Sequence, residues 1–201
     1  MTSGQSKVLD AAVACIAETG LDGTSIRQVA ARASVSIGAV QHHYPTKDAL
    51  LTAAMAHLET TYRERLARST AGATTADDLL RRTVHALVPD GKDDRRATAL
   101  WVAFVARAAV HAPTAEQHRR LWQRAEDDVT HLVSAALHEH GPVPSEQARE
   151  SAAGLLALAD GLSVAVLLEP GRMSEDRAHG LLDVALNALL QRTPAVKPSR
   201  S

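Results

Sequence analysis

The stretch from Thr24 to Leu51 constrains the fold most, because its residues are spaced like two short helices joined by a tight turn. Apolar residues at helical spacing predict the first helix over residues 25–32. Ser36 is placed to cap a second helix over residues 37–43, and Pro45 ends that helix because the residue before a proline avoids the α region. Two short helices that cross at such a turn form a helix-turn-helix.

The second of these helices presents small and amide-bearing side chains, which is typical of a helix that enters the major groove of DNA. Gln41 is a candidate base reader, because glutamine pairs with adenine through two hydrogen bonds. The other candidate DNA contacts lie on or beside the two helices: Thr24, Ser25, Arg27, Ser36, Ile37, Gly38, Ala39, His42, His43 and Lys47. Three of these residues have structural alternatives, since Ser25 can be a helix cap only, Arg27 can form a surface ion pair and His43 can pack inward.

The whole stretch resembles the N-terminal segment of the TetR family of transcriptional regulators. That segment ends in a turn, a short helix with an aromatic cluster and a Pro-x-Lys signature, here Ser34-Val35-Ser36, Val40-Gln41-His42-His43-Tyr44 and Pro45-Thr46-Lys47. The residues before it, Ala17 to Ser25, are also typical of the family. Members usually carry Gly where Ser34 stands, so this turn must accept a Cβ. Many carry Tyr at the positions of Gln41 and His43, so the family's aromatic phosphate contacts do not transfer here.

The charge of the chain narrows the class of nucleic-acid binder. Its 201 residues include 22 Lys and Arg against 23 Asp and Glu, which argues against a protein that coats nucleic acid without specificity. The first fifty residues are balanced too, with Lys7, Arg27, Arg32 and Lys47 against Asp10, Glu18, Asp22 and Asp48. DNA affinity is therefore expected to depend on backbone amides, helix N-termini and a few placed cations.

Segments that would direct the chain to a membrane are not visible in the sequence. No signal peptide is recognisable, and the longest apolar run, residues 162–168, is too short to cross a bilayer. The single cysteine excludes an intramolecular disulfide. We therefore expect a soluble cytoplasmic protein without membrane contact.

The rest of the chain predicts an all-α protein of about nine helices, because alanine is abundant and period-two β patterns are absent. We expect a three-helix DNA-binding domain over residues 1–50, a helical ligand-binding and dimerisation domain over 51–192, and a disordered tail over 193–201. A helix over residues 46–69 joins the two domains. The later helices are expected at residues 75–88, 93–111, 114–139, 145–169 and 174–191.

The helix predicted at residues 145–169 is apolar nearly all round. Between Gly154 and Leu168 only Asp160 and Ser163 are polar, and a helix of this kind must be buried on all sides. We expect it to pair with the last helix and with their copies in a second subunit, as a four-helix bundle. A larger monomeric core is the alternative. The predicted interface residues are Leu155, Leu162, Val166, Leu182, Ala185 and Leu189.

The TetR resemblance implies the same homodimer, and it also implies a pocket for a small molecule that shifts the spacing of the two reading helices. Three of only five aromatic residues fall on the predicted sixth and seventh helices. The candidate ligand-binding residues are Trp101, Phe104, Val105, Trp122 and Asp160. Ordinary core packing is the alternative for the aromatics. For Asp160 the alternative is a pair with Arg107 or with a helix terminus.

The sequence therefore predicts a ligand-responsive regulator, by family default a repressor, that binds a palindromic operator as a homodimer and is released by a small molecule. Its partners would be double-stranded DNA, an effector and a second copy, with no cofactor and no metal. An enzyme is not expected, because His138 and His140 point different ways round a helix and no nucleophile or phosphate motif is present. A helical scaffold that docks a protein partner instead of DNA is the alternative.

Overall fold

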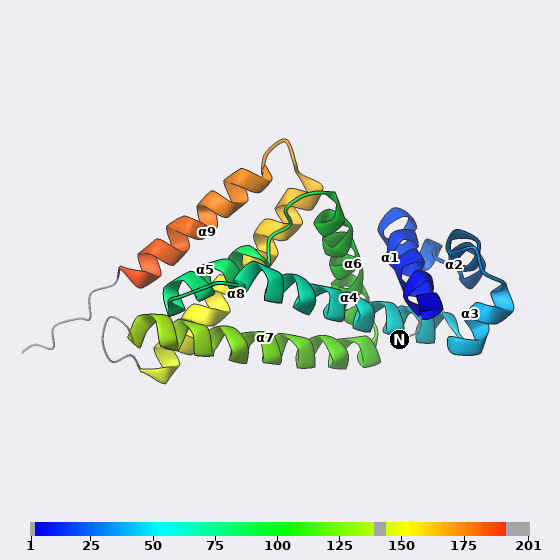
Figure 1. Cartoon of the computed structure of the whole chain (residues 1–201), viewed down its shortest axis with the longest axis horizontal. Helices are drawn as coiled ribbons and strands as arrows, with labels where there is room; N and C mark the ends of the chain where they lie inside the picture. The colour runs from blue at the N-terminus through cyan, green and yellow to red at the C-terminus, as the bar shows by residue number, and fades with distance from the viewer. Residues whose placement is uncertain (1–2, 139–143, 192–201) are drawn as a thin grey trace, which may run out of the picture. The chain divides into compact units, whose positions relative to one another are not determined.

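The computed structural model describes residues 3–138 and 144–191, and within these residues the chain forms nine α-helices and no strand (Figure 1). The helices are α1 (Ser3–Gly23), α2 (Ile26–Ala33), α3 (Ile37–His43), α4 (Lys47–Thr70), α5 (Ala76–His85), α6 (Lys92–Ala108), α7 (Ala112–His138), α8 (Ser145–Leu168) and α9 (Glu175–Leu190). The all-α prediction is confirmed. The predicted tail over residues 193–201 lies outside the described residues.

Helix starts follow the capping residues that the sequence contains. The hydroxyl of Ser25 accepts a hydrogen bond of 3.3 Å from the Gln28 backbone N–H and donates one of 2.8 Å to the Gln28 side chain. Ser36 likewise accepts from the N–H of Ala39 at 3.1 Å. A side-chain oxygen at this position satisfies one of the free N–H groups at a helix start. The two short helices therefore begin where the sequence predicts.

The turn between α2 and α3 is closed by a residue in the left-handed region. Ser34 has φ 55° and ψ 44°, and among the described non-glycine residues it alone has a positive φ. Its N–H donates to the carbonyls of Ala30 and Ala31, so this conformation ends α2. The prediction that the turn accepts a Cβ is confirmed, and the steric cost of such a conformation is about 1–2 kcal/mol.

The chain divides into two compact units, and the first comprises residues 1–66 and 89–119. In this unit α1 packs against α2 and against α6. Ion pairs join α4 and α6 at both ends, since Asp48 lies 2.9 Å from Arg107 and Arg65 lies 2.8 Å from Asp94. These two pairs place the helices side by side and antiparallel.

The second unit comprises residues 67–88 and 120–201, and its core is formed by α5, α7, α8 and α9. Most of the predicted dimer contacts lie in this core. Five of the six predicted contacts are buried within their own chain: Leu155, Leu162, Val166, Leu182 and Leu189. The sixth, Ala185, packs against the same core. The largest apolar residues of α8 and α9 face inward because α5 and α7 cover them, so they are not free to meet a second copy.

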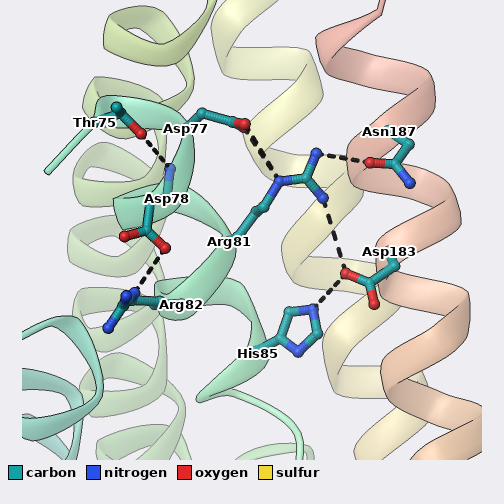
Figure 2. A network of polar contacts seen from close by, with 8 residues as sticks. All are labelled: Thr75, Asp77, Asp78, Arg81, Arg82, His85, Asp183 and Asn187. Atoms are coloured by element: carbon teal, nitrogen blue, oxygen red, sulfur yellow. Dashed lines mark hydrogen bonds and ion pairs between the residues drawn. The ribbon is translucent and has the colours of Figure 1, made fainter. Parts of the chain in front are cut away.

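A polar network holds α9 to α5 along one flank (Figure 2). Arg81 donates a hydrogen bond of 2.7 Å to Asn187, and it lies 3.9 Å from Asp183. His85 reaches the same Asp183 carboxylate at 2.8 Å through Nε2. One flank of α9 is therefore bound to α5 and one face lies in the core. The remaining side of the helix is the one open to other contacts.

The helix α8 bears on the expectation that the chain has no segment able to span a membrane. Within the described residues it is the one helix that is long and apolar enough to cross a bilayer, with a mean hydropathy of 1.9 over its most apolar 18 residues. The unbroken apolar run is short, and the helix begins with polar residues. Length and composition alone do not separate a span from the core helix of a globular protein, and eight of its residues are buried against the rest of the unit.

We expect Ser34→Gly to raise the free energy of unfolding by about 1 kcal/mol, because glycine reaches a positive φ without the steric penalty but loses more chain entropy on folding. Urea unfolding measures the change. Ser34→Ala is the matched control, because it removes the hydroxyl and keeps the Cβ, and it should stay within about 0.5 kcal/mol of the parent. A glycine variant no more stable than the alanine variant would contradict the strain argument.

Candidate functional site

The helix α3 leaves almost its entire surface open. Val40 is its one buried residue, and the other six are exposed, Gln41 and His42 among them. Gly38 is not required by packing, since a Cβ added there would meet nothing closer than the Ser36 hydroxyl at 3.9 Å. Small exposed residues beside an amide side chain form a surface that another molecule can approach closely.

One of the predicted DNA contacts is buried, and another is exposed as a contact requires. Thr24 is only 2% exposed, and its hydroxyl donates to the carbonyl of Gly20 at 2.8 Å. Its side chain therefore closes the corner between α1 and α2 and is not available to a phosphate. His43, for which an inward position was the alternative, is exposed, and its Nδ1 lies 3.5 Å from the side-chain nitrogen of Gln5.

The cations of this region differ in how far they are already paired. Arg32 forms two hydrogen bonds of 2.6 Å with the Glu18 carboxylate, and these bonds hold the pKa of Glu18 below its usual range. Lys47 is half-buried and donates to the carbonyl of Asp22 at 3.0 Å. Arg27 is exposed and makes no ion pair within the described part of the chain. Of these three cations, Arg27 is therefore the one that has no partner in the described residues.

The predicted ligand-binding residues separate into two groups. In the first unit the rings of Trp101 and Phe104 lie 5.8 Å apart, and His118 stacks on Trp101 at 5.5 Å. His118 is a member of this cluster that the sequence did not assign to it. Trp122 and Asp160 belong to the second unit, where both are half-buried. Arg107, the expected partner of Asp160, pairs with Asp48 instead.

A cavity of about 140 Å³ opens in the first unit beside α4 and α6. Phe104 lines it, whereas Trp101 and Val105 do not. The remaining walls mix apolar and polar residues on α4 and are mostly polar near the start of α7: Leu21, Asp48, Leu51, Thr52, Met55, Arg107, His111, Pro113, Thr114 and Gln117. A space of this size holds a small molecule of a few heavy atoms.

Tyr62 on α4 is a second feature that the sequence did not single out. Its hydroxyl is buried and has no hydrogen-bond partner in the described residues, and burial raises the pKa of Tyr62 to about 12. A buried hydroxyl without a partner destabilises the protein by about 1–3 kcal/mol. The periodicity of α4 assigns Tyr62 to an apolar stripe, and the unpaired oxygen becomes visible only in three dimensions.

Metal-ligating side chains are not grouped in threes anywhere in the described residues. His138 ends α7, where its ring bonds the carbonyl of Ser134, while Glu139 and His140 lie outside the described residues.

Two family descriptions match the chain. Residues 8–54 match the bacterial regulatory proteins of the tetR family, and residues 76–191 match the C-terminal region of BetI-type transcriptional repressors. The HTH-type transcriptional regulator BetI of Burkholderia mallei is 35% identical over 163 residues, which cover 79% of this chain and 78% of that protein.

Solved structures have the same fold. A transcriptional regulator from Rhodococcus sp. RHA1 has a TM-score of 0.81 and 31% sequence identity, over 97% of this chain and 100% of the other. A regulator from Saccharomonospora viridis, solved in complex with choline, has a TM-score of 0.80 and 21% identity, over 89% of this chain and 92% of the other. With the open α3 and the two family matches, the chain belongs to the TetR family of bacterial transcriptional regulators, and its C-terminal region is of the BetI type.

Proposed function

We propose that this protein is a cytoplasmic repressor that binds a palindromic operator as a homodimer and is released by a small molecule. The observation that carries the proposal is α3, which buries Val40 alone and leaves its small residues and Gln41 exposed. Such a helix reads only a few base pairs, so two copies on a two-fold axis are needed to recognise an operator.

The proposed DNA contacts divide by chemistry. Gln41 reads a base, and Ile37, Gly38 and Ala39 allow α3 to enter the groove closely. Cations, histidines and helix starts position the protein on phosphates: Ser25, Arg27, Ser36, His42, His43 and Lys47. Thr24 is left out of these contacts, because the whole residue is only 2% exposed.

We expect Arg27→Ala to weaken binding to all DNA sequences alike and to lower the slope of log affinity against log salt by roughly one. The reason is that Arg27 is exposed and makes no ion pair in the described residues. Fluorescence anisotropy over a salt series measures the slope. The matched control removes the paired Glu18 and Arg32 together by alanine substitution, which changes no net charge. An Arg27→Ala slope equal to that of the control would refute a phosphate contact.

Gln41→Ala is expected to reduce operator affinity by about 1–3 kcal/mol and to relax sequence preference at one position of each half-site. The Gln41 side chain is exposed on α3, so a loss of affinity in this variant would not be caused by a loss of core packing. Selection of bound sequences from a random DNA pool, for the parent and the variant, measures the preference. An unchanged preference would remove Gln41 as a base reader.

The dimer face is proposed to lie on the outer side of α8 and α9, away from the buried residues. On α8 the exposed Gly154, Ala157, Gly161 and Leu168 follow helical spacing, and on α9 the exposed Leu181, Val184 and Ala188 do so. Val184 is 66% exposed and Leu168 is 65% exposed. A second copy covers these two stripes in a four-helix bundle, which also accounts for the apolar character of α8.

Val184→Glu is expected to convert the dimer into monomers and to abolish operator binding, because each two-fold interface would then contain two buried carboxylates without partners. Light scattering measures the molar mass. Val110→Glu is the matched control, since it makes the same chemical change at a residue that is 87% exposed outside α8 and α9. A Val184→Glu protein that stays dimeric would contradict this interface.

The effector is proposed to bind beside α4 and α6. Phe104 in the wall of the cavity, the neighbouring Trp101 with Val105, and the unpaired hydroxyl of Tyr62 support this position. Trp122 and Asp160 belong to the second unit and do not line this cavity.

A scaffold that docks a protein partner is the second candidate. It is favoured by the thin positive charge, because Arg32 and Lys47 are already engaged within the chain. A band-shift assay with the DNA that flanks the protein's own gene separates the two. A band shift at physiological salt that non-specific competitor DNA does not abolish supports the repressor.

A further inference from the structure

We propose that the cavity beside α4 and α6 binds a small organic acid with a short apolar body, whose carboxylate replaces that of Asp48 on Arg107. The binding itself follows from the cavity, and its effect on DNA rests on the proposed function.

The ion pair at the edge of the cavity is unequal in burial. Arg107 donates from Nη2 to Asp48 at 2.9 Å, but its side chain is 24% exposed whereas that of Asp48 is 67% exposed. Arginine stays charged and its planar group is shaped to hold a carboxylate with two hydrogen bonds. If a ligand supplies that carboxylate, Asp48 returns to water at little cost, and Arg107 keeps a partner.

The remaining lining fits the body of such an acid. Leu51, Met55 and Phe104 provide apolar wall, and Gln117 and His111 provide polar groups at the start of α7. Asp48 is the one acidic residue among those lining the cavity. A cationic ligand would therefore have to bind beside Arg107, with Asp48 as its sole countercharge, so the lining favours an anion.

Occupation of this site would change how α4 is held. Asp48 lies in the first turn of α4, directly after Lys47, whose Nζ binds the carbonyl of Asp22. Its pair with Arg107 ties the end of α4 nearest α3 to α6, while the pair of Arg65 with Asp94 ties the other end. A ligand carboxylate on Arg107 releases only the first tie, so the end of α4 that follows the reading helix is held less tightly.

Titration calorimetry of the full-length protein tests the binding. Sodium hexanoate is the probe, hexanamide is its neutral match, and choline is the cationic comparison. We expect hexanoate to bind at least tenfold more tightly than either. Equal affinity for hexanoate and hexanamide, or tighter binding of choline at this site, would overturn carboxylate recognition.

Two variants give opposite expectations. Arg107→Gln should weaken hexanoate binding at least tenfold, whereas Asp48→Asn should strengthen it severalfold because the internal competitor is lost. Arg96→Gln is the matched control, since Arg96 pairs with Asp93 on the same helix outside the cavity. If Arg107→Gln fails to fold, the Asp48→Asn result still decides, and no gain in affinity there would refute the exchange.

Operator binding separates this inference from the proposed function. Hexanoate, at constant total salt, should lower the operator affinity of the parent severalfold and leave that of Arg107→Gln unchanged. A protein that binds no operator under any condition defeats the proposed function, while calorimetry still decides the site. A protein that binds both operator and hexanoate without coupling defeats the release of α4.

Discussion

The burial of one side chain, Val40, holds the reading helix against its unit and decides what the rest of that helix can do. A seven-residue helix is too short to be stable alone. It persists because Ser36 caps its start and Val40 is removed from water, and this minimal attachment leaves the other six residues exposed. The Ser34 turn contributes to this exposure, because it sets the angle at which α3 leaves α2.

The C-terminal helices differ from α3 because they bury many of their side chains. On α9, residues such as Leu182 enter the core, Asp183 and Asn187 bind α5, and Val184 stays outside. Periodicity in the sequence located the helices and their apolar character correctly. It did not distinguish the side that meets the chain's own core from the side left for a partner, because both sides are apolar. Only the positions of α5 and α7 resolve that difference.

The structural features that the sequence predicted correctly are local ones. Caps and the turn depend on residues three or four apart, and they were found where expected. Side-chain partners were missed because they depend on residues distant in the chain: Arg32 with Glu18, Arg107 with Asp48, and His118 on Trp101. Trp101 and Trp122 belong to different compact units, so their predicted grouping stays a prediction.

The two ion pairs along α4 give the helix the mechanics of a lever. Arg65 and Asp48 are separated by a stretch of rigid helix roughly 25 Å long, at about 1.5 Å per residue. If the pair at Arg65 acts as a pivot, a tilt of about 5° moves the far end by roughly 2 Å. A displacement of that size is close to the whole length of a hydrogen bond, so a rotation too small to disturb the core is enough to disengage a base.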